Sequence, residues 1–202
     1  MGFFSKKSIT PIADDDTAIL DALSGPTPGA GVTPAIALTC TPVLAAVRLI
    51  SEACAVLDVN IVDGDKPVAA HPALTLLRGQ VNAWTSGYEL RRDLVAETLL
   101  HDSGAMAWVN RIEDKPVEII NYKRSTIQVQ YEETREPLYR LSGRPVPAAD
   151  ILHLRGPFEK CPVSLAREAI GAAIAMEAHA GRMFQNGARP GGVIEFPARV
   201  SP

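Results

Sequence analysis

The chain has 202 residues, 47% of them hydrophobic, and a formal net charge of −3. This length and apolar content predict one large domain, or one domain with an appendage, and exclude a disordered tail. The mildly acidic balance excludes a protein that coats nucleic acid through a broad basic surface. Three cysteines are widely spaced and odd in number, so we expect small buried thiols at Cys40, Cys54 and Cys161.

Residues 1–34 are predicted to form a flexible N-terminal arm. They contain the acidic run Asp14–Asp16 and a dense set of Gly and Pro residues from Gly25 to Gly31, which disfavours helix and strand. The glycines do not make a phosphate-binding loop, because no Lys-Ser/Thr pair follows them and no strand precedes them. The first seven residues lack the apolar core of a signal peptide, so we expect synthesis inside the cell.

The first helix is predicted to open at Thr41, with Thr41 as the N-cap and Pro42 at the first helical position. Apolar residues then recur at intervals of three and four. They predict one apolar stripe made of Val43, Val47, Ile50, Cys54 and Leu57. A short strand over residues 59–61 and a tight turn at Asp63-Gly64 are expected next.

Two more helices are predicted over residues 73–78 and 86–101. Ser86 and Glu89 have the spacing of a capping box, in which each residue satisfies a backbone N–H of the other. The helix that follows is apolar on two sides, so we expect it to be sandwiched. The two sides are Leu90 with Leu94, and Tyr88 with Val95 and Leu99.

Five strands are predicted after Gly104, over residues 105–112, 117–122, 126–131, 138–141 and 151–154. Short polar turns separate them, which favours an antiparallel meander. Ile127 and Val129 alternate with Gln128 and Gln130, so one face of the sheet should be exposed to solvent.

A long helix is predicted over residues 163–185, ended by Asn186-Gly187 as a left-handed cap. Between Ala169 and Gly181 most of its residues are Ala or Gly, and small side chains let helices approach closely. Its charged residues argue against a membrane span. Residues 193–196 start an apolar strand without a partner, which indicates a fragment. The predicted fold class is α+β, with an antiparallel strand meander followed by a long alanine-rich helix.

No cluster of residues predicts catalysis, a cofactor or a metal. His101-Asp102-Ser103 holds the residue types of a hydrolytic triad, but neighbours in sequence point apart, so we expect polar residues at a helix end. His153 lies in an apolar strand and is expected to be a hydrogen-bonded structural histidine. Lys123-Arg124 is expected to be a solvated turn.

Several segments, in this order, resemble the portal proteins of long-tailed bacteriophages. They are Leu76-Leu77, Asn82, Trp84-Thr85 and Tyr88-Glu89-Leu90, then Asp150–Arg155, then Pro162–Leu165 with Ala169, Ile170, Ala173 and Glu177, and finally Phe184–Ile194. The chain departs from the family at Gly104–Ala107, where Gly-Asn-Ala-Tyr is usual, and at the entry to the long helix, where it has Cys161–Leu165. The family also continues well beyond residue 202, with a second channel helix and a C-terminal crown.

The resemblance implies a structural subunit without enzyme activity. Residues 35–160 would form the wing, 161–190 the stem helix and 191–202 the start of a clip strand. The implied assembly is a dodecameric ring at one capsid vertex, built in the host cytoplasm and then part of a virion or phage-like particle. The implied partners are other copies of the chain, the major capsid protein, the terminase packaging motor, the head-tail connector protein and double-stranded DNA passing without sequence specificity. The mild negative charge suits a channel through which DNA slides.

The long helix supplies the candidate site residues. Small side chains are expected where subunits meet, at Gly171, Ala172, Ala175, Ala178 and Gly181. Polar residues expected on the channel side are Glu177, Arg182 and Asn186.

Two other functions stay open at this stage. One is a non-catalytic α+β adaptor or scaffold without a channel. The other is a small hydrolase that uses His153, or His101 with Ser103, although the chain has no nucleophile in a glycine-flanked elbow. An infectious phage, a prophage and a gene transfer agent are equally compatible sources.

Overall fold

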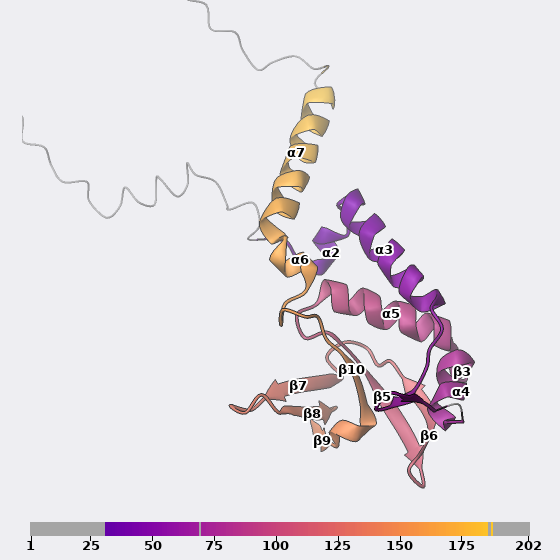
Figure 1. Cartoon of the computed structure of the whole chain (residues 1–202). Coiled ribbons are helices and arrows are strands. Elements are labelled where there is room, and N and C mark those ends of the chain that lie inside the picture. The colour runs from indigo at the N-terminus through magenta and orange to yellow at the C-terminus, as the bar shows by residue number, and fades with distance from the viewer. Residues whose placement is uncertain (1–30, 69, 186, 188–202) are drawn as a thin grey trace, which may run out of the picture.

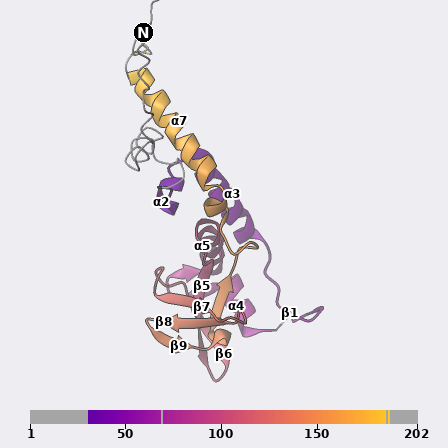
Figure 2. The same cartoon turned by 90° about the vertical axis from the view of Figure 1, so that its left-hand side faces the viewer.

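The computed structural model describes residues 31–68, 70–185 and 187. The elements in chain order are α2 (Pro34–Ala37), α3 (Thr41–Val56), β1 (Val62–Asp63), β2 (Lys66–Pro67), α4 (Pro72–Arg78), β3 (Gln80–Asn82), β4 (Thr85–Ser86), α5 (Gly87–Leu100), β5 (Ala105–Ile112), β6 (Lys115–Ile120), β7 (Ile127–Tyr131), β8 (Pro137–Leu141), β9 (Arg144–Val146), the 3₁₀ turn η1 (Ala148–Asp150), β10 (Ile151–Leu154), α6 (Pro162–Leu165) and α7 (Arg167–Gln185). The strands gather at one end and α7 extends away from the other (Figures 1 and 2). The predicted α+β class with a long C-terminal helix is confirmed.

Helix α3 begins where the sequence predicts but buries a different face. Its N-cap is Cys40, not Thr41, because the Cys40 carbonyl already accepts the first helical hydrogen bonds. The buried residues are Ser51 and Ala55, whereas Leu57, in the predicted apolar stripe, is 66% exposed. Small side chains allow α3 to lie close to α5, and the Arg91 guanidinium of α5 donates to the Ala55 carbonyl at 2.6 Å.

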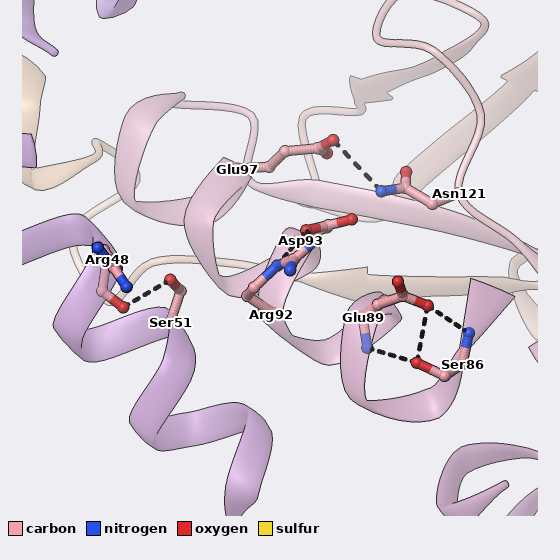
Figure 3. A network of polar contacts seen from close by, with 8 residues as sticks. All are labelled: Arg48, Ser51, Ser86, Glu89, Arg92, Asp93, Glu97 and Asn121. Carbon is pink, nitrogen blue, oxygen red and sulfur yellow. Dashed lines mark hydrogen bonds and ion pairs between the residues drawn. The ribbon is translucent and has the colours of Figure 1, made fainter.

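Helix α5 starts with the predicted capping box (Figure 3). The Glu89 N–H donates to Ser86 Oγ at 3.2 Å, and the Ser86 N–H donates to Glu89 Oε2 at 2.8 Å. The hydrogen bonds that the Ser86 N–H and hydroxyl donate to the Glu89 carboxylate hold the pKa of Glu89 below its ordinary value. The helix lies between α3 and β5, so the predicted sandwiched position is confirmed.

The predicted single meander is wrong, because the strands form two separate three-stranded antiparallel sheets, β10-β5-β6 and β7-β8-β9. Strands β5 and β10 have the predicted bounds. After β6 the chain leaves the first sheet through residues 121–126, where Ser125 has φ 81°. Strand β10 then returns to the free edge of β5, with Leu154 opposite Ala105.

Two short hairpins differ from the sequence prediction. The strand expected over residues 59–61 lies later, as β1, and pairs with β2 around Gly64, which has φ 58°. Strands β3 and β4 form a hairpin that the sequence did not predict. The Asn82 side chain holds it to the first sheet by donating to the Ile119 carbonyl at 2.9 Å.

The main core lies between α5 and the first sheet. Its buried residues are Val81, Leu90, Leu94, Ala105, Ala107 and Ile119. Apolar side chains from α4 and β5 close its edges. The body of the molecule therefore buries its core within one chain.

Candidate assembly site

A second apolar cluster joins α2 and the start of α3 to α6 and α7. Its buried residues are Ala37, Cys40, Cys161, Val163 and Ile170. Cys40 and Cys161 are buried free thiols, as expected, whereas Cys54 is a free thiol that is only half-buried. Helix α7 contributes Ile170 to this cluster and extends away from the rest of the described chain (Figure 2).

The entry to the long helix is fixed by a contact that the sequence did not reveal. The Cys161 N–H donates to Asp102 Oδ1 at 2.9 Å, so the turn after α5 holds the start of α6. Burial raises the pKa of Asp102, but hydrogen bonds from Cys161 and Ser164 outweigh it and leave that pKa below its ordinary value. An acidic residue facing a predicted helix start is the only signal that could have suggested the pair.

The predicted single helix over 163–185 is in fact two helices. Helix α6 begins at Pro162, and Ala166, with φ −94° and ψ 10°, separates it from α7. The expected left-handed cap is present at Gly187, with φ 66° and an N–H that donates to the Phe184 carbonyl at 3.0 Å. Its partner Asn186 lies outside the described residues.

An apolar groove of about 280 Å³ opens beside the second cluster, between α3, α5 and the α6–α7 corner. It is lined by Pro42, Val43, Ala46, Val47, Ile50, Leu99, Pro162, Val163, Ala166 and Ile170. Three of these residues, Val43, Val47 and Ile50, belong to the stripe predicted on α3. That stripe therefore lines an open surface, because α5 covers a different side of the helix.

Most of α7 projects beyond the chain's own core. Ile170 is buried and Ile174 is half-buried against the second cluster. Met176 is 66% exposed and Phe184 is 77% exposed. At 3.6 residues per turn, Met176 and Met183 lie about 150° around the helix from the two isoleucines. The helix therefore presents apolar side chains on the side opposite its own core.

The predicted interface residues fall in two environments. Gly171 is buried and Ala172 is half-buried, whereas Ala175, Ala178 and Gly181 are exposed. Helix geometry spreads the five positions over about 180° of the circumference. They are therefore not one narrow stripe, and their role as a subunit interface stays a prediction.

Two of the predicted channel-side residues are described and exposed, namely Glu177 and Arg182. Five positions along a helix place them about 140° apart, so they do not share one face. Asn186 lies outside the described residues. A channel-side role for any of the three stays a prediction.

The residues of the triad-like sequence point to different partners. Asp102 accepts from Cys161, and Ser103 Oγ accepts from Arg124 at 3.0 Å. Burial, and then the charge of Arg124, holds the pKa of His101 below its ordinary value. This arrangement agrees with polar residues at a helix end.

His153 joins the two sheets. Its Nε2 lies 2.8 Å from the Ser103 carbonyl, and its Nδ1 lies 2.9 Å from the Tyr139 hydroxyl on β8. The expected hydrogen-bonded structural histidine is confirmed. Burial, and then the charge of Arg155, holds its pKa below the ordinary value, although the Ser103 carbonyl acts in the opposite sense.

Within the described residues, no three His, Cys, Asp or Glu side chains are placed to hold a metal ion. Over the same part of the chain, none of the helices combines the length and the apolar character that crossing a membrane requires.

Comparison with known proteins connects this architecture to a family. The family model of phage portal proteins matches residues 41–202. A 58-residue stretch is 45% identical to the probable portal protein of Streptomyces phage phiC31 and covers 26% of this chain and 13% of that protein.

Solved structures share the fold. A HK97 family phage portal protein from Corynebacterium diphtheriae matches with a TM-score of 0.59 and 23% identity, over 82% of this chain and 55% of that one. A chain from the neck of an empty gene transfer agent particle, computed with C6 symmetry, matches with a TM-score of 0.56 and 23% identity, over 82% and 49%. A chain from the virion of a native gene transfer agent particle matches with a TM-score of 0.54 and 22% identity, over 91% and 56%.

The chain thus spans about half the length of the solved proteins it matches. The likeness to them establishes the fold, and the family match runs from α3 to the last residue. The chain belongs to the phage portal protein family.

Proposed function

We propose that the protein is a structural subunit of a portal, a ring at one capsid vertex through which double-stranded DNA is packaged and ejected. The continuous family match over residues 41–202 carries this proposal. The ring is dodecameric and belongs to a virion or a gene transfer agent particle. It anchors the terminase motor, and then the head-tail connector protein, within the shell of the major capsid protein.

The domain division follows the same proposal. Residues 35–160 are the wing, 161–190 the stem and 191–202 the start of the clip, after an N-terminal arm of residues 1–34. The direction in which α7 extends from the two-sheet body supports this division (Figure 2).

Exposed apolar surface supports assembly with other chains. Each copy leaves the α3–α5–α7 groove and the outer side of α7 uncovered within the described residues. A closed ring needs a heterologous interface, in which two different surfaces of identical subunits meet. Two separate apolar surfaces on one chain meet this requirement.

Mass photometry and electron microscopy of the full-length protein test the proposal. Uniform closed rings are expected, whereas monomers or dimers alone would contradict it and favour an adaptor. The proposal also includes no catalytic step, so the purified protein should neither turn over ATP nor hydrolyse esters. Activity that is abolished by His101→Ala or His153→Ala would overturn this part.

A further inference from the structure

A mixed polar and apolar cleft of about 440 Å³ lies between the two three-stranded sheets. Met106 of β5 lines one side, and Ile127 and Val129 of β7 line the other. The loop between β6 and β7 contributes Lys123 and Arg124. The cleft therefore combines apolar walls with two cationic side chains, and the portal role does not account for it.

The charges of this cleft favour an anionic occupant. Lys123 and Arg124 are both exposed, and Arg124 is oriented by its hydrogen bond to Ser103 Oγ at 3.0 Å. Glu97 is the one carboxylate among the lining residues that the structure describes. It already accepts from Asn121 Nδ2 at 3.3 Å (Figure 3). Lys123 and Arg124 together carry two positive charges, and Glu97 carries one negative charge. The lining of the cleft therefore has a net positive charge that an anionic group can neutralise.

The chain itself contains a segment of matching chemistry. Ile12 is followed closely by Asp14-Asp15-Asp16, so an apolar residue precedes three carboxylates. This order pairs an apolar side chain with the walls of the cleft and acidic side chains with its cationic loop. No other run of three acidic residues occurs in the sequence.

The distance along the chain is sufficient. Val32 packs on the same cluster as Leu100, the last residue of α5, and Ser103 at the cleft follows three residues later, within about 11 Å. Gly31 lies fifteen positions after Asp16 in the sequence. Such a tether spans up to about 50 Å when extended, well beyond what the path requires.

We propose that residues 12–16 of the same chain bind in the cleft between the two sheets, with their carboxylates against Lys123 and Arg124. The segment bridges β7 of the second sheet to α5 and β5. It thereby adds a contact between two sheets that share no backbone ladder. This inference does not rest on ring formation.

Hydrogen exchange of residues 9–18 in the full-length protein, followed by mass spectrometry, tests the proposal. In the wild type these amides should exchange about tenfold more slowly than in an unstructured peptide, as expected for a few screened ion pairs. Salt at 1 M should remove most of this protection. Exchange at the unstructured rate in low salt would overturn the proposal.

Charge reversal and its rescue identify the cleft as the binding surface. Lys123→Glu with Arg124→Glu should abolish the protection, and Asp14→Lys, Asp15→Lys and Asp16→Lys in that background should restore it. The matched control, Arg140→Glu with Arg144→Glu, changes two exposed arginines of the second sheet that do not line the cleft. Protection from exchange that survives the charge reversal at the cleft contradicts the proposal. So does a folded charge-swapped variant in which the protection is not restored.

Disulfide trapping decides which copy supplies the segment. Asp15→Cys combined with Gln128→Cys, a cleft residue of β7, should give a bond within one chain after oxidation. Crosslinked pairs of chains on a non-reducing gel would show that a second copy fills the cleft, and would overturn the same-chain assignment. The two single variants control for bonds to Cys40, Cys54 and Cys161.

Discussion

The two apolar clusters of this molecule differ in how completely the described chain covers them. The cluster between α5 and the first sheet is closed on every side by elements of the same chain, and Leu90 at its centre is 1% exposed. The cluster at the base of α7 is open, with an apolar groove beside it and a helix that continues far beyond it. The first forms the closed core of the subunit, whereas the second leaves apolar surface uncovered among the described residues.

The difference shows in how the two regions use glycine. A Cβ on Gly87, at the start of α5, would lie 2.0 Å from the Leu77 carbonyl oxygen. A Cβ on Gly181, in the outer half of α7, would meet nothing within 4 Å. In the body, glycine permits close contact between backbones of one chain. At Gly181 the described part of the chain gives no such reason for it.

The largest expected effect comes from adding one methyl group to each region. Gly87→Ala should lower the free energy of unfolding by about 4 kcal/mol or more, because the backbone of α4 or α5 must move. Gly181→Ala should raise it by about 0.5–1 kcal/mol, because alanine favours an exposed helix. Urea unfolding of the two variants checks both values. Equal effects at the two sites would remove the distinction between the regions.

Side-chain truncation sharpens the same comparison. Leu90→Ala should cost about 3 kcal/mol, because it leaves a cavity in a closed core. Met176→Ala should change the free energy of unfolding of the unassembled subunit by no more than about 0.5 kcal/mol. Thermal unfolding at a concentration too low for assembly is the measurement. A large loss from Met176→Ala would mean that α7 packs within its own subunit.

A smaller effect, depending on pH, is expected within the body. The pKa of His153 is lower in the folded chain than its ordinary value of 6.5, so the folded state binds fewer protons than the unfolded state. Stability should therefore fall as the pH drops through 6.5 towards the folded pKa, by less than about 1 kcal/mol after solvent screening.

The titration of His153 can be followed by NMR. Its midpoint should lie below 6.5, and Arg155→Gln should move it upward, because a nearby positive charge disfavours the imidazolium. A midpoint at or above 6.5 would show that the ring is not buried between the sheets as described. Arg140→Gln, an exposed change elsewhere on the second sheet, is the control.

The substitution with the smallest expected effect on subunit folding should nevertheless abolish ring assembly. Ala175 is exposed on α7, so Ala175→Leu should leave the circular dichroism of the full-length protein unchanged. If Ala175 lies between subunits, the same overpacking of about 1–3 kcal/mol recurs at every interface and rings should be lost in electron micrographs. Intact rings would refute the interface. Lost folding would instead place Ala175 in the interior of its own subunit.

Several features could be predicted from the sequence because their causes are local. The capping box of Ser86 and Glu89 sets a helix start through hydrogen bonds that span three residues. Pro42 favours the start of α3 because its fixed φ suits the first helical turn. Strands β5 and β10 were predicted with their observed bounds, since alternation and flanking turns are also local signals. The family resemblance rested on the order of such segments, and the family match confirms it.

Other features depended on which surfaces meet, and only the tertiary structure decided them. The apolar stripe of α3 predicted a buried face, but α5 packs against Ser51 and Ala55, whose small side chains allow a closer approach. The meander became two sheets because β10 pairs with β5, a choice between partners that strand patterning does not encode. Asp102 with Cys161, and His153 with Tyr139, meet across gaps of 59 and 14 residues. Contacts over such separations follow from packing, which local periodicity cannot specify.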